Sequence, residues 1–214
     1  MKPEKIGLNS KVIELGVWTR PSSGEVENGD SYLVKTHDDF VVIGVTDGLG
    51  HGKEASLAGR IAMDCMDSNS CDSLISIFQH CHEALKSTRG AVMSLASFHT
   101  TTNTMAWLGV GNIAGVLIRA SVSPVPQRET ILLRGGVVGL QLPQLYATEM
   151  SVSTGDTLIF ATDGISRSFA DNLNIQDSPQ RIADRIGSQF WTSTDDALVV
   201  VARYRGRSNA KYSA

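Results

Sequence analysis

Short apolar runs separated by turn residues dominate the hydrophobic pattern of this 214-residue chain. Runs rich in β-branched residues and bounded by Gly, Pro, Asn, Asp or Ser predict β-strands. The expected strands cover residues 11–20, 31–36, 39–47, 91–98, 104–110, 114–120, 130–134, 147–152, 156–163 and 197–204. The run 39–47 is apolar enough to be buried on both faces of a sheet. The closely spaced runs from 91 to 163 predict an antiparallel meander, with Gly155-Asp156 as the turn between its last two strands.

Three other stretches have helical spacing. One helix is expected from Lys53 to about Met66, and another over 178–190, with Pro179 in its first turn. Between them, one apolar stripe is formed by Leu74, Ile77, Phe78, Cys81 and Leu85. Asp72 is the candidate N-cap of that helix. The order of strands and helices predicts an α+β sandwich with helices covering the sheet faces, and the absence of strict βαβ alternation argues against a Rossmann-type fold.

The length fits one domain, expected over residues 1–204, followed by a basic, frayed tail over 205–214. Hydrophobic residues make up 42% and charged residues 19%, which is ordinary for a globular protein. A net charge of -3 gives no general attraction to nucleic acid or anionic lipid. The sequence contains no membrane-length apolar stretch, no signal-peptide core and no CxxC pair. We therefore expect a cytoplasmic protein without nucleic-acid or membrane partners.

The candidate chemistry lies in acids at the ends of strands. Asp47 and Asp163 each end an apolar run within a Thr-Asp-Gly tripeptide, and Asp195 and Asp196 precede the last strand. Carboxylates at several strand ends would repel one another if those ends met, and a hard cation with oxygen ligands would remove that repulsion. The glycine after Asp47 and after Asp163 allows close backbone approach. Thr-Asp-Gly is also an ordinary strand-ending turn, so composition alone leaves both interpretations open.

Three segments carry a resemblance to a known family. In this order, DGLGHGKEA, GDTLIFATDGI and STDDALVVV resemble the metal motifs of metal-dependent protein phosphatases of the PP2C type, and more narrowly of their bacterial SpoIIE-like branch. Further matches are ENGDSYLV, RGAVMSLASF and WLGVGNIAGVLIR, so the resemblance runs from about residue 25 to about residue 204. The ordered set carries it, since each motif alone is weak. With no sensor or receiver domain in it, the chain is most similar to the stand-alone stressosome phosphatases of that branch.

The resemblance implies an αββα sandwich with two Mn²⁺ or Mg²⁺ ions at one end of two central sheets. Matched position by position, Asp47 would bridge both ions and Gly48 would offer its carbonyl to one of them. Asp163 and Asp195 would bind the other ion. Asp30 would hold a water molecule of the metal site.

Four further positions complete the candidate site. Asp195 is preferred within the acidic pair because it is the first acid of the DDxT-like motif, and Asp196 is the second candidate. Leu198 replaces the usual Thr or Ser and removes a hydroxyl near that acid. Arg20 is either a ligand of the substrate phosphate, whose geometry a guanidinium matches, or a solvated surface residue. His51 is expected to be a turn residue close to the metal ligands rather than a proton donor.

The leading hypothesis is a phosphatase that hydrolyses phosphoserine or phosphothreonine. Water activated by two metal ions would attack phosphorus in line, so no protein nucleophile is required. The resemblance implies phosphorylated substrates among stressosome scaffold or STAS-domain proteins. One alternative is a phosphatase-like module that only binds phosphoproteins, but every core acid is retained. Another is a phosphatase for small molecules, for which no nucleotide or sugar signature is present.

Overall fold

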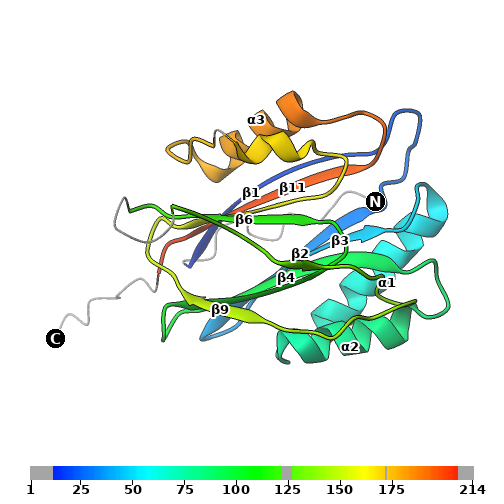
Figure 1. Ribbon diagram of the computed structural model, residues 1–214, viewed down its shortest axis with the longest axis horizontal. Coiled ribbons are helices and arrows are strands. Elements are labelled where there is room, and N and C mark those ends of the chain that lie inside the picture. The colour runs from blue at the N-terminus through cyan, green and yellow to red at the C-terminus, as the bar shows by residue number, and fades with distance from the viewer. Residues whose placement is uncertain (1–11, 122–126, 172, 207–214) are drawn as a thin grey trace.

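A computed structural model describes residues 12–121, 127–171 and 173–206. Two β-sheets pack face to face and helices cover both outer faces, which gives four αββα layers (Figure 1). The predicted α+β sandwich of two mostly antiparallel sheets is therefore confirmed. Most of the tail expected over 205–214 lies outside the described residues. In the described residues, no helix is long and apolar enough to cross a membrane.

The first sheet has the strand order β1-β11-β10-β6-β7, with antiparallel pairing throughout its described strands. These strands are β1 (Ile13–Arg20), β6 (Ala114–Ile118), β7 (Arg128–Thr130), β10 (Thr157–Ala161) and β11 (Ala197–Tyr204). The short 3₁₀ helix η1 (Arg167–Ala170) and helix α3 (Pro179–Phe190) pack on its outer face. The Ser178 side chain caps α3, and Pro179 occupies the first turn as expected.

The second sheet has the order β2-β3-β4-β5-β8, and β9 also pairs with β5. Its strands are β2 (Asp30–Thr36), β3 (Phe40–Gly48), β4 (Ala91–His99), β5 (Thr104–Val110), β8 (Leu133–Arg134) and β9 (Thr148–Ser151). Helices α1 (Lys53–Ser68) and α2 (Leu74–Leu85) cover its outer face. The predicted stripe of α2 is buried there in full.

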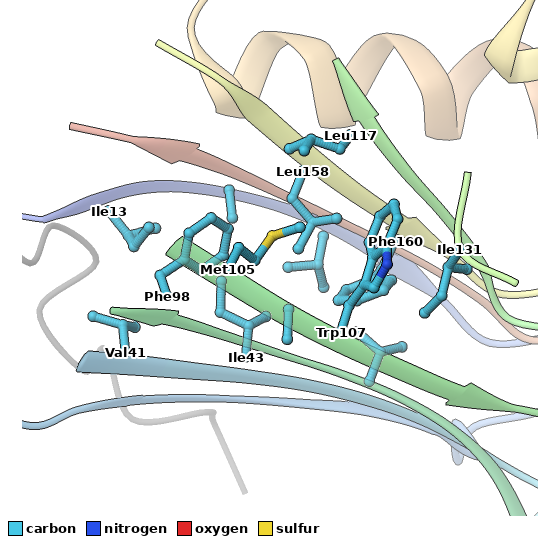
Figure 2. Packing of buried hydrophobic residues seen from close by; sticks show 14 of the residues in the cluster. Ile13, Val41, Ile43, Phe98, Met105, Trp107, Leu117, Ile131, Leu158 and Phe160 are labelled. Carbon is cyan, nitrogen blue, oxygen red and sulfur yellow. The ribbon is translucent and has the colours of Figure 1, made fainter. Parts of the chain in front are cut away.

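A hydrophobic core fills the space between the sheets (Figure 2). In that view Phe98, Met105 and Trp107 of the second sheet point toward Leu158 and Phe160 of the first. Burying a side chain of this size stabilises the fold by about 1.5–3 kcal/mol. This packing fixes one sheet against the other, so the ends of their strands are held in a defined relative position.

The N-cap of α2 is Ser73, so the expectation for Asp72 was wrong. The Ser73 hydroxyl oxygen accepts a hydrogen bond from the backbone N–H of Ser76 at 3.1 Å. The Asp72 carboxylate instead lies 3.4 Å from the His80 ring on the surface. Both side chains are good caps, and the backbone of the preceding loop selects between them.

The stretch 91–163 is not one continuous meander, because successive strands within this stretch belong to different sheets. Thr130 ends β7 in the first sheet and Leu133 begins β8 in the second, where β8 runs parallel to β5. Ile131, between them, is buried in the inter-sheet core. The single strand expected over 130–134 is therefore divided between two sheets.

The Gly155-Asp156 turn also connects strands of different sheets, rather than two paired strands of one hairpin. It connects β9 of the second sheet to β10 of the first. The buried Asp156 carboxylate accepts hydrogen bonds from the backbone N–H groups of Ala120 and Ser153 and from the Arg119 side chain. Alternating apolar residues identify a strand, but they do not identify which of two sheets it joins.

Candidate active site

Strand pairing brings four acidic segments to one end of the sandwich. Asp30 and Asp47 are directly opposite each other in the β2–β3 register. Asp163 follows β10 and Asp195 precedes β11, and these neighbouring strands are antiparallel, so the two acids lie at the same end. Cross-strand partners on one face have side chains close enough to interact. The strand ends that the sequence analysis considered do meet in space.

Burial and the clustering of these acids raise the pKa of three of them, Asp47, Asp30 and Asp163. The pKa of Asp47 is raised from 3.8 to about 8, first by burial and then by the charges of Asp163, Asp195 and Asp196. Burial followed by the charge of Asp47 raises the pKa of Asp30 well above its usual value. The pKa of Asp163 is raised by burial and by Asp195, and a hydrogen bond from Asn112 opposes this rise. We call this end of the sandwich, where Asp30, Asp47, Asp163 and Asp195 lie, the acid end. Its raised pKa values favour binding of a positive ion.

Asp30 is buried, and only one of its two carboxylate oxygens accepts a hydrogen bond from the described residues. The Thr162 hydroxyl donates a hydrogen bond of 2.7 Å to its Oδ2 and accepts one of 2.8 Å from the backbone N–H of Leu198. Asp30 Oδ1 has no hydrogen-bond partner among the described residues. A buried carboxylate oxygen without a donor is costly unless water or an ion approaches it. This position suits the predicted contact of Asp30 with a water molecule of a metal site.

The two acids of the Asp-Asp pair differ in their surroundings. Asp196 is buried, and its carboxylate oxygens accept hydrogen bonds of 2.7 Å from the backbone N–H groups of Ser22 and Gly29. Asp195 is half-buried and contributes more than Asp196 to the raised pKa of Asp47. Asp196 therefore fastens the 21–29 loop to the start of β11. Asp195 Oδ1 accepts a hydrogen bond of 2.9 Å from the backbone N–H of Asp196, and its Oδ2 is the oxygen that could bind an ion.

The glycines of the two Thr-Asp-Gly tripeptides allow close packing of the backbone. A Cβ atom on Gly48 would clash with the backbone of Ala55 in the first turn of α1. A Cβ atom on Gly164 would clash with the carbonyl oxygen of Asp196. These contacts set α1 against the end of β3, and the loop after β10 against the start of β11. The Gly48 carbonyl remains a candidate ligand.

Leu198 faces the inter-sheet core rather than the acids. Its side chain is almost completely buried in the cluster shown in Figure 2. The hydroxyl that contacts Asp30 comes from Thr162, within the second Thr-Asp-Gly tripeptide. The departure from the DDxT-like motif therefore leaves Asp30 with a hydroxyl donor.

Arg20 and His51 have different relations to the acid end. Arg20 ends β1 opposite Ala197, and its guanidinium lies 4.7 Å from the centroid of the Trp191 ring. The Trp191 ring N–H in turn donates to the backbone carbonyl of Asp195. Arg20 is thus beside the acids, as a phosphate ligand would have to be. His51 is exposed and contacts Glu25 at 2.9 Å, which supports its interpretation as a turn residue.

Sequence reasoning missed Asn112, which lies in the loop between β5 and β6. Its side-chain amide donates a hydrogen bond of 2.7 Å to Asp163 Oδ2. Its own Oδ1 is buried and has no partner among the described residues. The Gly-Asn pair after β5 indicates a turn, but nothing local in the sequence shows that this turn lies against Asp163. Asn112 orients the Asp163 carboxylate.

The oxygen-only donor set fits a hard cation such as Mg²⁺ or Mn²⁺. In residues 12–121, 127–171 and 173–206, no three Asp, Glu, His or Cys side chains converge closely enough to enclose an ion unaided. Mg²⁺ usually keeps several water ligands and takes only one or two carboxylates. A site built on these acids would accordingly be completed by water, for which the open Asp30 oxygen is a suitable acceptor.

The raised pKa of Asp47 predicts how stability depends on pH without metal. Between pH 3.8 and about 8 the folded protein keeps a proton that the unfolded chain has released. The free energy of unfolding in EDTA should therefore fall as pH rises through this range. Urea denaturation at pH 5, 6, 7 and 8 measures it, and Asp47→Asn should show a shallower fall. Identical slopes in both proteins would contradict the raised pKa.

Comparison with known proteins identifies the family. Residues 37–205 match the family model of Stage II sporulation protein E (SpoIIE). Phosphoserine phosphatase RsbX of Bacillus subtilis (strain 168) is 26% identical over 194 residues, which cover 88% of this chain and 93% of RsbX.

Two solved structures share the fold. One, from work on the bacterial stressosome as a modular system adapted to control secondary messenger signaling, is 32% identical with a TM-score of 0.80. The aligned region covers 89% of this chain and 99% of that chain. The other is RsbX in complex with magnesium, which is 21% identical with a TM-score of 0.81 and covers 92% and 97% of the two chains. The chain belongs to the SpoIIE family of PP2C-type, metal-dependent serine/threonine phosphatases.

Proposed function

We propose that this protein removes phosphate from phosphoserine or phosphothreonine on stressosome proteins, with two Mn²⁺ or Mg²⁺ ions at the acid end. When bound, the ions would lower the pKa of a shared water molecule and neutralise phosphate charge. The observation that carries the proposal is the convergence of acids from four separate segments, where burial and the neighbouring carboxylates raise the pKa of Asp47 to about 8.

Each residue has a distinct task in this proposal. Asp47, whose pKa is raised by burial and by Asp163, Asp195 and Asp196, would bridge the ions, and the Gly48 carbonyl would bind one of them. Asp163, oriented by Asn112, and Asp195 would bind the other ion. This division follows the family resemblance and agrees with the position of Asp195, which is half-buried whereas Asp196 is buried.

Two further residues would act on water and substrate. Asp30 would accept a hydrogen bond from the attacking water through its unpartnered Oδ1, while Thr162 holds its other oxygen. Arg20 would bind the substrate phosphate, since a guanidinium offers paired N–H donors to phosphate oxygens. Its contact with Trp191 holds the side chain next to Asp195.

The proposed substrates follow from the relatives. RsbX is a phosphoserine phosphatase, and another similar structure comes from work on the bacterial stressosome. Phosphorylated stressosome scaffold or STAS-domain proteins are therefore the proposed partners of this chain, and the cytoplasm is its proposed location.

Metal removal tests the chemistry. Hydrolysis of p-nitrophenyl phosphate should stop in EDTA and return when Mn²⁺ or Mg²⁺ is added in excess, because the proposed nucleophile is water activated by the bound ions. Serine- and cysteine-directed inhibitors should have little effect. Full turnover after exhaustive dialysis against EDTA would rule out the metal mechanism.

A further inference from the structure

Exposed large hydrophobic side chains gather near the acid end. In the described part of the chain they are Val26, Leu57, Leu132, Leu140 and Tyr146. Val26 belongs to the 21–29 loop that Asp196 holds, and Leu57 lies in the opening turns of α1 after Gly48. The other three belong to the segment 131–147, which contains β8. Scattered exposed hydrophobics are normal, but a group beside an active site indicates a contact surface.

Two contacts tie the segment 131–147 to the acid end. Gly111 directly precedes Asn112, and its backbone N–H donates a hydrogen bond of 2.8 Å to the carbonyl of Arg134. The Leu140 side chain lies against Gly90, whose carbonyl accepts a hydrogen bond from Leu49, next to Gly48. The segment is therefore continuous with the rim of the proposed active site.

The exposed side chains of this segment face the helix-covered side of the second sheet. Arg134 is the register partner of Val110, whose side chain packs with α1 and α2. Neighbours in register project to the same face of a sheet. Leu132 lies between Ile131 and Leu133, which both pack in the inter-sheet core, and its own side chain is exposed. In Figure 1 the yellow-green chain after β8 crosses α1 and α2 on its way to β9, and Gly139 hydrogen-bonds to His82 of α2.

The composition of the segment suits a negatively charged protein surface. The Arg134 guanidinium lies 4.7 Å from the centroid of the Tyr146 ring and forms no ion pair with the described residues. From Ile131 to Thr148 the sequence contains no acid, and Arg134 is its single cation. Leu132 is 70% exposed and Tyr146 is 51% exposed. Arginine and aromatic side chains carry much of the binding energy at protein interfaces.

We propose that Leu132, Arg134, Leu140 and Tyr146 form a docking patch that binds a folded phosphoprotein substrate while its phosphorylated residue reaches the acid end. The inference rests on the proposed protein phosphatase function. Because the patch lies on the outer face of the sheet and the acids lie at the strand ends, a short peptide around the phosphorylated residue would contact little of it. The patch would lower KM for the folded substrate without changing the chemical step.

The test compares three substrates: p-nitrophenyl phosphate, a short phosphoserine peptide, and a folded phosphorylated STAS-domain protein carrying that peptide sequence. The variants are Leu132→Ala with Tyr146→Ala, and separately Arg134→Glu. Arg181→Glu, an exposed residue on α3 across the sandwich, is the matched charge-reversal control. With the folded phosphoprotein as substrate, we expect each patch variant to have a kcat/KM about 10-fold or more below that of wild type, mainly because KM rises. Hydrolysis of the two small substrates, and all activities of Arg181→Glu, should remain unchanged.

The outcomes separate the inference from the proposed function. Wild type inactive on all three substrates with Mn²⁺ would end both. Wild type that hydrolyses only p-nitrophenyl phosphate would contradict the proposed protein phosphatase function and the inference with it. Patch variants that retain full phosphoprotein turnover would overturn the docking patch alone. Equal losses on all three substrates would mean that the substitutions disturb the acid end, which also contradicts the inference. Sedimentation that shows a dimer lost in the patch variants, with phosphoprotein turnover intact, would assign the patch to a second copy of this chain.

Discussion

Asp47→Asn is expected to abolish turnover while leaving the metal-free protein at least as heat-stable as wild type. Burial together with the charges of Asp163 and Asp195 raises the pKa of Asp47 to about 8. Folding near neutral pH therefore requires this carboxyl to take up a proton, and a neutral amide should remove that cost in the absence of metal. The substitution should also remove the ligand proposed to bridge both ions, which no other side chain could replace.

Melting curves with and without Mn²⁺ measure both effects. A ligand at 100 times its Kd stabilises the folded state by about 2.7 kcal/mol, or roughly 5–10 °C in Tm for a domain of this size. Wild type should show a rise of this order and Asp47→Asn a much smaller one. Asp64→Asn, which removes an exposed acid on α1, serves as a control and should behave like wild type. Equal Mn²⁺-induced rises in wild type and Asp47→Asn would reduce Asp47 to a turn residue.

The second large effect separates two neighbouring acids by different measurements. Asp195→Asn should melt like wild type in EDTA, yet lose activity and most of the Mn²⁺-induced rise, because an amide is a poorer ligand for a hard cation. Asp196→Asn should be destabilised in EDTA. Its new amide group would face the backbone N–H of either Ser22 or Gly29, which both now donate to the carboxylate.

The expected cost for Asp196→Asn is about 1–3 kcal/mol, the usual penalty for a buried donor left without an acceptor. For a domain of this size that lowers Tm by roughly 2–12 °C. The Mn²⁺-induced rise should persist in this variant. If Asp196→Asn lost the rise and Asp195→Asn kept it, the assignment within the acidic pair would be reversed.

The apolar pattern was sufficient to predict the strands, the helices and an α+β sandwich, and the family motifs supplied the acids of the candidate site. Alternating and continuous apolar runs predicted nearly every strand, and the stripe from Leu74 to Leu85 predicted the buried face of α2. These signals are local, because burial of one face imposes a period of two on a strand and of 3.6 on a helix. The ordered motifs with Asp47, Asp163 and Asp195 then identified the family.

Which strands share a sheet, and what each polar group contacts, could be learned only from the folded structure. Residues 130–134 read as one strand, yet β7 and β8 join different sheets, because the free edges of β6 and β5 belong to different sheets. The carboxylates of Asp195 and Asp196 are chemically identical and adjacent in sequence. They differ because a loop more than 160 residues away donates two N–H groups to one of them. Asn112 meets Asp163 only because the loops after β5 and β10 fold to the same end, and contacts between distant segments leave no periodic trace in the sequence.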